Sequence, residues 1–370
     1  MTTIKVAMVI RGDALTVKGG DSIQFAATAR YLRSLGCSVT EFIGPQQFQS
    51  YKGYDLVHIF NLQTIKFSLG EARKVASLGV PLVLSTIYWD FESNEQAIID
   101  SLQSTPKGRL AVTILGFKLA KSLKRLSLRF RFKGPRRRLL NMASILLPNS
   151  WQEVCQLEKV FELSLRERSF VVKNAIDSKL FAVSASPPQS IVIRGFHSGN
   201  YILQVGRVES AKRQVESIKA AKKLGIPIVI VGKIQEQWYF DLCREEATGH
   251  QVLIVDECSQ DELVGYYSHC KVHILPSLRE TPGLASLEAA ACGANIVTTE
   301  IGSAKEYFGD QAYYCNPYDS ASIEAALRAA WGHEWPNEDL RGLVLKEYTW
   351  EKTADETLAA YRIVKGKPSI

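Results

Sequence analysis

Short apolar runs alternate with helical segments along almost the whole chain, and this alternation limits the fold more than any other feature. The first run, at 5–11, has the length of a buried strand, and the segment at 21–36 has helical spacing and closes on a glycine. Strands that are buried on both faces and separated by helices pair in parallel, through right-handed crossovers. The pattern therefore predicts an α/β fold with doubly wound parallel sheets.

The alternation is interrupted once, at 181–190, where Pro187 and Pro188 stand among small polar residues. We interpret this stretch as a linker, with a surface loop inside one domain as the alternative. Since 370 residues are too many for one ordinary core, we expect two Rossmann-like domains, over 1–185 and 186–345. Further strands are expected in the first domain at 38–44, 55–61, 81–90, 144–150 and 169–175, and in the second at 200–206, 226–232, 250–257 and 271–277.

Composition excludes several classes of protein. Apolar residues make up 46% of the chain and charged residues 22%, a balance typical of globular proteins. No apolar run approaches the roughly 20 residues of a spanning helix, so a cytoplasmic location is expected. The seven cysteines form no Cys-x-x-Cys pair, which favours reduced thiols over a metal site.

One segment carries the basic character of the protein. Residues 101–152 contain no acidic side chain but twelve lysines and arginines, whereas the net charge of the whole chain is only +7. The remainder is therefore net negative. Such a concentration of one sign of charge indicates a partner of the opposite sign.

Apolar residues recur within this segment at helical spacing, over 115–138. They are Leu115, Leu119, Leu123, Leu126 and Phe130. A basic amphipathic helix of this kind is typical of docking on an anionic membrane surface, which here would be the inner face of the cell membrane. Two alternatives stay open, packing of the stripe on the domain and nucleic-acid binding. The second lacks a nucleic-acid recognition motif, so no nucleic acid is expected as a partner.

Two cations follow the first strand of the second domain. Gly206 and Arg207 come directly after the strand, and Lys212 stands at the start of the next helix. Because ligands of open α/β sheets bind beyond the carboxyl ends of the strands, both cations could contact a diphosphate in the cleft expected between the domains. The alternative is that both are solvated surface charges.

Two carboxylates, Glu280 and Glu288, flank the turn at Pro282-Gly283 after another strand. We expect a helix to start near Ala285, with Glu288 in its first turn. The free N–H groups of that turn form an anion site, Glu288 could accept hydrogen bonds from a ribose diol, and Glu280 could reach a sugar hydroxyl. The alternative is that Glu288 complements the helix dipole and Glu280 lies on the surface.

These motifs resemble the retaining nucleotide-sugar glycosyltransferases of the GT-B fold, family 4 type. The family's E-x7-E followed by a helix and a glycine is similar to Glu280, Glu288 and the run "AAACGANIVTTEIGSAKEYF", and its G-R-x4-K is similar to Gly206-Arg207 and Lys212. Three further stretches resemble the family's glycine loop, domain exit and C-terminal helix: "KGGDSIQFAATARYLRSLG", "FVVKNAIDSKLF" and "YTWEKTADETLAAYRIV". The resemblance implies that a C-terminal helix, over 346–370, packs back on the first domain.

The resemblance also implies roles for matching positions. Arg207 and Lys212 would hold the donor diphosphate and stabilise the leaving nucleotide. Glu288 would bind the ribose and Glu280 the transferred sugar. The remaining donor contacts would be Gly19, Gly20 and Gly206 and the backbone around Pro282, Gly283 and Leu284. Glycines allow such close approach because they lack a Cβ atom.

Two positions depart from the family pattern. Relatives carry a histidine near the reacting sugar where this chain has Tyr88, followed by Trp89 and Asp90, so Tyr88 is the candidate for that contact. His58 lies inside a strand and is interpreted as a packed core residue. The stretch "IVDECSQ" lacks the glycine of the nucleobase loop, which leaves uridine and guanosine donors equally open.

The expected protein is thus a metal-independent, retaining hexosyl- or related glycosyltransferase without a cofactor. It would move a sugar from a UDP- or GDP-sugar to a glycan or lipid-linked acceptor, in the synthesis of a cell-surface polysaccharide or glycolipid. The alternative is a non-catalytic GT-B module that binds a nucleotide sugar.

Overall fold

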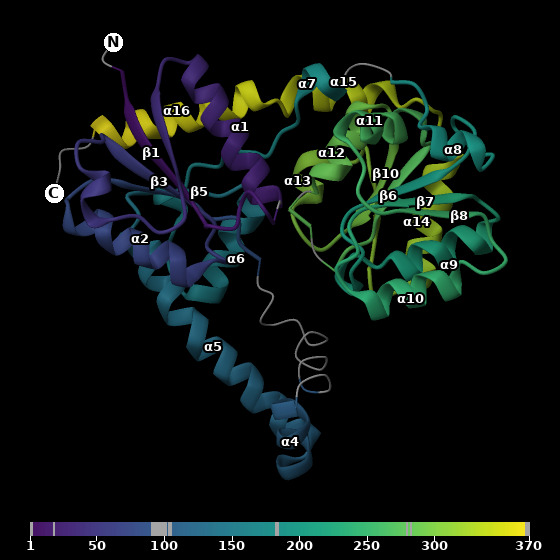
Figure 1. Cartoon of the computed structure of the whole chain (residues 1–370), viewed down its shortest axis with the longest axis horizontal. Coiled ribbons are helices and arrows are strands. Elements are labelled where there is room, and N and C mark those ends of the chain that lie inside the picture. Colours follow the sequence, from purple (N-terminus) through teal and green to yellow (C-terminus); the bar gives the residue numbers. More distant parts are fainter. Residues whose placement is uncertain are drawn as a thin grey trace. The chain divides into compact units, whose positions relative to one another are not determined.

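The computed structural model describes residues 3–17, 19–89, 102, 106–181, 185–278, 280–281 and 283–366. Contacts between Cα atoms divide the chain into two compact units. Unit 1 comprises Met1–Val172 together with Ala354–Ile370, and unit 2 comprises Lys173–Thr353. Each unit is an α/β sandwich around a parallel sheet (Figure 1).

The sheet of unit 1 has five strands within the described residues, in the order β2-β1-β3-β4-β5. The strands are β1 (Lys5–Ile10), β2 (Ser38–Ile43), β3 (Leu56–Phe60), β4 (Leu82–Ser85) and β5 (Ile145–Leu147). All pair in parallel; Val6, for example, lies opposite Val39 on one side and Leu56 on the other. The helices are α1 (Gly20–Ser34), η1 (Phe48–Tyr51), α2 (Ile65–Ser77), α4 (Pro106–Leu115), α5 (Phe117–Met142), α6 (Trp151–Phe161) and η2 (Arg166–Arg168).

Successive residues of β1 face opposite sides of this sheet and enter separate cores. Val6 and Met8 pack with α1 and with residues of α16 (Trp350–Gly366), among them Tyr361. Ala7 and Val9 pack with α2, α5 and α6 on the other face. Because helices cover both faces at β1, its residues from Val6 to Ile10 are all apolar and buried.

The sheet of unit 2 has six strands within the described residues, in the order β11-β10-β9-β6-β7-β8. They are β6 (Ile202–Val205), β7 (Ile228–Val231), β8 (Val252–Val255), β9 (Val272–Leu275), β10 (Asn295–Thr299) and β11 (Tyr313–Cys315). The helices are α7 (Ser178–Phe181), α8 (Gln189–Ile193), η3 (Ser210–Lys212), α9 (Gln214–Leu224), α10 (Gln237–Glu246), α11 (Gln260–His269), α12 (Leu284–Ala291), α13 (Ala304–Phe308), α14 (Ser320–Gly332) and α15 (Glu338–Glu347). Ile202 packs on the face with α9, α10 and α14, and Leu203 on the face with α11, α12 and α15.

Two doubly wound parallel sheets are therefore confirmed, and one strand prediction is wrong. The run at 169–175 is not a strand, and its flanks form only the isolated bridges Leu146–Ser169 and Ile176–Thr349. The helix at Gln237–Glu246 was not predicted at all. His58 is the packed core residue expected, because both ring nitrogens are satisfied, by Tyr361 at 2.7 Å and Ser85 at 2.9 Å, and burial lowers its pKa to about 3.

The described part of the proline stretch, Phe181 and residues 185–190, lies within unit 2. Phe181 and Ile191 belong to a core cluster of that unit, and a Cβ on Gly265 of α11 would lie 2.7 Å from the carbonyl oxygen of Ser186. This arrangement agrees with the alternative of a surface loop inside one domain. The contact division separates the units at Val172–Lys173, rather than at the predicted position 185.

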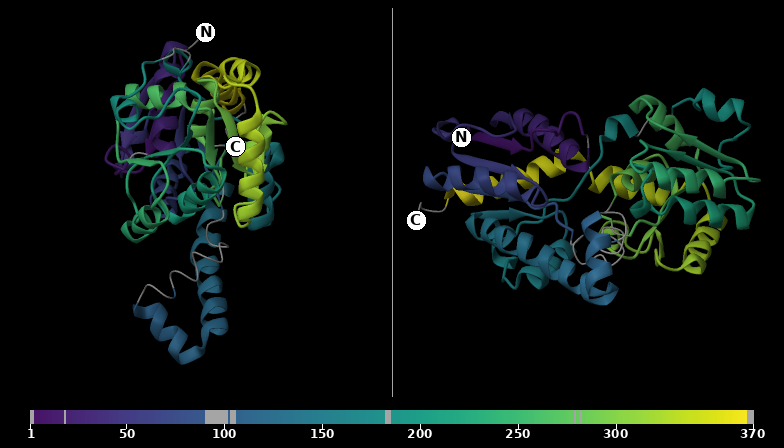
Figure 2. Two further views of the ribbon diagram at one scale, coloured as in Figure 1. Left: turned by 90° about the vertical axis from the view of Figure 1, so that its right-hand side faces the viewer. Right: turned by 60° about the horizontal axis from the view of Figure 1, so that its bottom comes forward.

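The basic segment forms two helices of unit 1. In Figures 1 and 2, α5 leaves the sheet and carries α4 against its far end, after a break at Gly116 with φ of 74°. Within the described residues, neither these helices nor any other are long and apolar enough to cross a bilayer.

Candidate functional site

The carboxyl end of β6 meets that of β7 at two glycines. Gly206 has φ of 152°, and a Cβ on Gly232, which also has φ of 152°, would lie 2.2 Å from the carbonyl oxygen of Gly206. Residues with side chains rarely adopt such φ values, so both positions require glycine. The chain can therefore turn sharply out of the sheet and present Arg207 directly beyond the strand.

Arg207 is exposed at this edge, with 54% of its side chain accessible. Its guanidinium lies 3.0 Å from Glu209, and its carbonyl oxygen accepts a hydrogen bond from Gln214 at 2.8 Å. Burial raises the pKa of Glu209, although the charges of Arg207 and Lys212 act in the opposite direction. The anchored backbone and the accessible guanidinium leave Arg207 able to contact an anion.

Lys212 and Glu280 form an ion pair. Lys212 ends η3, after β6, and its Nζ lies 2.5 Å from Oε1 of Glu280, 68 residues further along the chain. The two side chains are 22% and 8% exposed, so the pair is largely shielded from water. Gln204 of β6 donates a hydrogen bond to the Lys212 carbonyl oxygen at 2.7 Å and fixes the turn.

Glu280 is held by its backbone as well as by this pair. Its N–H donates to Ile301 and its carbonyl oxygen accepts from Ser303, at 3.2 and 3.0 Å. A Cβ on Gly302, where φ is 134°, would lie 2.1 Å from that carbonyl oxygen. The segment carrying Glu280 therefore rests directly on the backbone that follows β10.

The start of α12 lies beside Glu280. A Cβ on Gly283, the N-cap residue with φ of 86°, would lie 3.3 Å from Glu280 Oε2. The helix begins at Leu284, so Glu288 is its fifth residue. The prediction that Glu288 lies in the first turn is thus wrong by one position, because the helix starts before Ala285. Arg279 and the predicted contact Pro282 lie outside the described residues.

Glu288 lies among buried groups. The hydroxyl of Tyr267, on α11, donates to its Oε2 at 2.9 Å. Burial raises the pKa of Glu288 to about 7, although this hydrogen bond favours the charged form. At neutral pH the carboxylate can therefore change its proton occupancy when a ligand binds.

Two members of this edge were not predicted. Glu209 lies between the two predicted cations, and its place in "GRVESAK" could have indicated a partner for Arg207. His273 of β9 accepts a hydrogen bond from the Val205 N–H at 3.4 Å, which links β9 to β6. Burial lowers the pKa of His273 to about 3, and the charge of Lys212 acts in the same direction, so this ring is neutral.

The predicted residues of unit 1 fall in two places. Gly19 and Gly20 begin α1, where the Gly19 N–H donates to Ser22 at 2.9 Å and a Cβ on Gly19 would lie 3.0 Å from Asp21. Asp21 is bound by Arg11 at 2.8 Å. The glycine therefore allows the loop after β1 to pass closely over an anchored carboxylate.

Tyr88 lies in the core of unit 1 and is fully buried. Its ring packs against Phe161, with centroids 5.3 Å apart, and the Arg136 guanidinium lies 5.5 Å from the ring centroid. Its N–H donates to Glu153 at 2.8 Å. The role of Tyr88 as a sugar contact stays a prediction. In this structure the side chain lies in the core, so it would have to move to reach the ligand.

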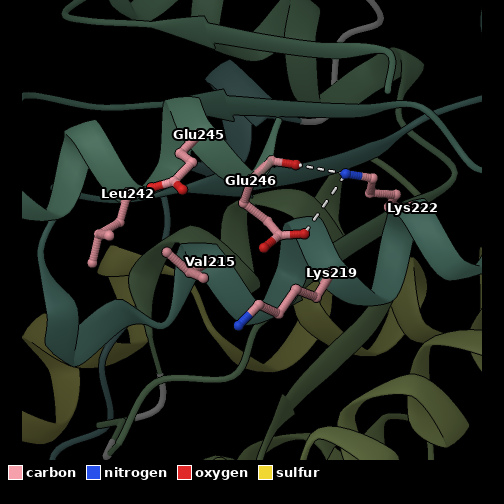
Figure 3. Close-up of a pocket in the computed structure, with 6 residues that line it drawn as sticks. All are labelled: Val215, Lys219, Lys222, Leu242, Glu245 and Glu246. Atoms are coloured by element: carbon pink, nitrogen blue, oxygen red, sulfur yellow. Dashed lines mark hydrogen bonds and ion pairs between the residues drawn. The ribbon is translucent and has the colours of Figure 1, made fainter. Parts of the chain in front are cut away.

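A separate pocket of about 410 Å³ lies between α9 and α10 (Figure 3). It is lined by Val215, Lys219, Lys222, Leu242, Glu245 and Glu246. Lys222 lies 3.9 Å from the Glu246 carboxylate. None of the predicted donor contacts line this pocket, so it is distinct from the edge described above. The described residues contain no group of three or more His, Cys, Asp or Glu side chains placed to hold a metal ion.

Comparison with known proteins finds a family model that matches the part of the chain carrying this edge. Residues 191–341 match the family model described as Glycosyl transferases group 1, a range that contains all the predicted contacts of unit 2. The glycogen synthase of Mycobacterium tuberculosis is 27% identical over 207 residues, which are 53% of this chain and 48% of that protein. The chain spans about half the length of the curated relatives it matches.

Solved structures resemble almost the whole chain. The sucrose-phosphate synthase of Thermosynechococcus elongatus has a TM-score of 0.72 at 15% identity, over 97% of this chain and 98% of that one. HepE of Anabaena, in complex with UDP and glucose, has a TM-score of 0.64 at 17% identity, over 96% and 98% of the two chains. At these identities the likeness shows the fold.

Proposed function

We propose that the chain is a glycosyltransferase, because it has the GT-B fold and its residues 191–341 match the family model of the glycosyl transferases group 1. It moves a sugar from a nucleoside-diphosphate donor to a glycan or lipid-linked acceptor, at the inner face of the cell membrane. The product is part of a cell-surface polysaccharide or glycolipid.

The observation that carries this proposal is the ion pair of Lys212 with Glu280 at the carboxyl edge of the unit 2 sheet. The family resemblance assigns Lys212 to the diphosphate and Glu280 to the transferred sugar. A sugar diphosphate has its phosphate and its sugar hydroxyls a few ångströms apart, so one cation beside one carboxylate suits it. A bound diphosphate would compete with Glu280 for the ammonium group and leave the carboxylate to accept from a sugar hydroxyl.

In the reaction, the bond between the anomeric carbon and the diphosphate oxygen breaks, and the nucleoside diphosphate leaves with the electron pair. Lys212 and the accessible Arg207 stabilise the charge that develops on that oxygen. The acceptor hydroxyl attacks the same face and its proton passes to the departing diphosphate oxygen, so the anomeric configuration is retained. Positive side chains at the leaving group make a metal unnecessary, and we expect transfer to continue in EDTA.

The nucleotide of the donor is a uridine or a guanosine diphosphate. HepE, which shares the fold, is bound to UDP and glucose, and this favours a UDP-sugar as the first donor to assay. A thermal-shift screen of UDP, GDP and their sugars would identify the base, because a ligand at about 100 times its Kd adds about 2.7 kcal/mol to the free energy of unfolding.

The second candidate is a non-catalytic module that binds a nucleotide sugar. Tyr88 favours it, because this side chain is buried in the core where relatives place a histidine near the sugar. Both candidates bind a donor, but only the enzyme releases free nucleotide in the presence of an acceptor.

Nucleotide release from the donor, with a membrane extract as acceptor source, therefore tests the proposal. We expect release by the wild type and its loss in Arg207→Ala and Glu280→Ala. Lys219→Ala removes an exposed cation of α9 in the same unit and should release nucleotide at the wild-type rate. Binding of a nucleotide sugar without release would favour the non-catalytic module, and the absence of binding would contradict both candidates.

A further inference from the structure

The hairpin of α4 and α5 exposes large apolar side chains at its far end. We call residues 109–126 the distal hairpin. Leu110 and Ile114 on α4 are 60% and 69% exposed. On α5, the exposed fractions of Leu119, Leu123 and Leu126 are 51%, 45% and 49%. The last three recur at helical spacing, so they form one apolar row on α5.

A separate buried cluster, which does not include these exposed leucines, lies between α4 and α5. Leu102 and Ala120 are buried, and Ala111 and Val112 of α4 pack against them. The exposed row is therefore not needed to join the two helices. A set of accessible apolar side chains on a projecting element of this kind marks an interaction surface.

Positively charged side chains lie on the same two helices as these apolar side chains. Arg109, Lys118 and Arg125 are exposed, and Lys124 is partly exposed. No acidic residue occurs in the sequence between 101 and 152 to neutralise them. The distal hairpin thus combines positive charge with accessible apolar area.

The part of α5 nearer the sheet is different. Leu139 and Leu140 are fully buried in a core cluster of unit 1, and Phe132 packs against that cluster. Arg136 is only 3% exposed and donates to Gln63 at 2.9 Å. The predicted basic stretch 115–138 therefore has two parts. Its C-terminal part packs on the domain, as the alternative to membrane docking expected. Its N-terminal part is accessible to solvent.

We propose that the distal hairpin docks on the surface of an anionic lipid bilayer. The leucines enter the boundary between headgroups and acyl chains, and the lysines and arginines contact lipid phosphates. A nucleic acid would bind the cations but would leave the leucines in water. A second copy of the hairpin would bring like charges together. This inference refines the membrane location proposed above, but vesicle binding requires no nucleotide sugar, so it can fail or succeed independently of glycosyl transfer.

Co-sedimentation of the full chain with vesicles tests the charge contribution. We expect binding to vesicles that contain phosphatidylglycerol, weaker binding at high salt, and little binding to phosphatidylcholine alone. Each cation near an anionic surface strengthens binding about fivefold, so Arg109→Gln, Lys118→Gln and Arg125→Gln together should weaken it roughly 100-fold. Glutamine keeps the helix, because its helix propensity is close to that of lysine and arginine.

A control variant with the same charge change lies on the same unit. Lys52→Gln, Lys66→Gln and Arg73→Gln remove three exposed cations outside the hairpin and should leave vesicle binding within about twofold of the wild type. Equal loss in both triple variants would show a general charge effect and overturn the docking surface.

The apolar contribution has its own pair of variants. Leu119→Gln, Leu123→Gln and Leu126→Gln should weaken binding at least about tenfold. A control with Leu35→Gln, Ile193→Gln and Leu242→Gln, all exposed elsewhere, should bind as the wild type does.

Thermal unfolding of every variant should match the wild type, because all the replaced side chains are accessible to solvent. Wild-type protein that ignores anionic vesicles at low salt, or that binds neutral vesicles equally well, overturns the proposal. Vesicle binding that persists in both hairpin variants overturns it as well. If the wild type instead sediments with RNA or associates with itself, and not with vesicles, those partners replace the bilayer.

Discussion

The Lys212 ammonium group carries two roles that substitutions can separate. It neutralises the largely buried carboxylate of Glu280, and it is the proposed contact of the donor diphosphate. Lys212→Met should lower the free energy of unfolding by about 2 kcal/mol, because an unpaired charge is left in a shielded place. It should also lower kcat/KM for nucleotide release about 100-fold or more.

The double variant Lys212→Met with Glu280→Gln removes both charges. It should recover most of the free energy of unfolding in urea denaturation but none of the nucleotide release. Recovery of release would mean that the pair serves stability alone.

Glu288 should make stability depend on pH. Burial raises its pKa in the folded protein to about 7, from an ordinary value of 4.5. The folded state therefore binds the proton more tightly than the unfolded state, and this stabilisation is complete below the ordinary pKa and lost as the pH rises through about 7. Between about pH 5 and about pH 8 the wild type should lose on the order of 3 kcal/mol that Glu288→Gln does not lose.

Urea denaturation of the ligand-free protein at both pH values measures this difference. Glutamine keeps an acceptor for Tyr267, so the comparison isolates the ionisation of Glu288. If the difference in the free energy of unfolding between wild type and variant stays constant with pH, a group other than Glu288 is responsible for the pH dependence.

Particular residues show what sequence alone could resolve at this scale. The strand ends and the spacing of charges indicated that Lys212 and Glu280 lie at one edge of the unit 2 sheet, but did not predict the ion pair between them. They could not show that Tyr88 is buried, because the long-range contact with Phe161 sets the direction of its side chain. The partner of Glu288 was missed for the same reason, since Tyr267 approaches it from a different helix.

At the scale of elements, glycines fix how the segment of Glu280 meets the sheet edge. Gly302→Ala would place a Cβ 2.1 Å from the Glu280 carbonyl oxygen, at a φ of 134° that alanine rarely adopts. We expect a loss of about 3 kcal/mol or more in the free energy of unfolding, and weaker donor binding because Glu280 is displaced.

Gly342→Ala is the control, because its Cβ would meet no atom within 4 Å and it lies inside α15. It should be neutral or up to about 1 kcal/mol more stable. If Gly302→Ala is as stable as this control in urea denaturation, the proposed contact between the two segments is absent.

Helices and strands whose apolar residues recur at a regular spacing were predicted well. The observed β1 and α1 agree with the expected runs at 5–11 and 21–36 within two residues, because each has a regular apolar pattern. The run at 169–175 has the composition of a strand but pairs only through the bridge of Leu146 with Ser169. An apolar run joins a sheet only where a strand at the edge of the sheet is free to pair with it. Composition does not show whether such a strand exists.

At the scale of the whole molecule, the two α/β units each combine a parallel sheet with helices on both faces. The alternation of apolar runs predicted this architecture. It did not predict where the chain passes from one unit to the other, because residues 185–193 pack on unit 2 through contacts with α11. The predicted boundaries at 185 and 345 describe folding domains and stay predictions.

The basic segment shows the same dependence on tertiary contacts. Sequence showed an amphipathic helix with one sign of charge. Only the structure separates Arg136, which is buried in unit 1, from Leu119, which is accessible. Sequence left membrane docking and packing on the domain open; the structure shows packing for the C-terminal part of α5, and membrane docking of the distal hairpin stays our proposal.

In the proposed function, the carboxyl edge of the unit 2 sheet binds a nucleoside diphosphate through Lys212. Isothermal titration of UDP and GDP into the wild type, Lys212→Met and Lys219→Met tests it most directly. We expect one nucleotide to bind the wild type and Lys219→Met with the same Kd, and to bind Lys212→Met about 10–100-fold more weakly. Equal Kd values for all three proteins, or no binding of either nucleotide to the wild type, would contradict it.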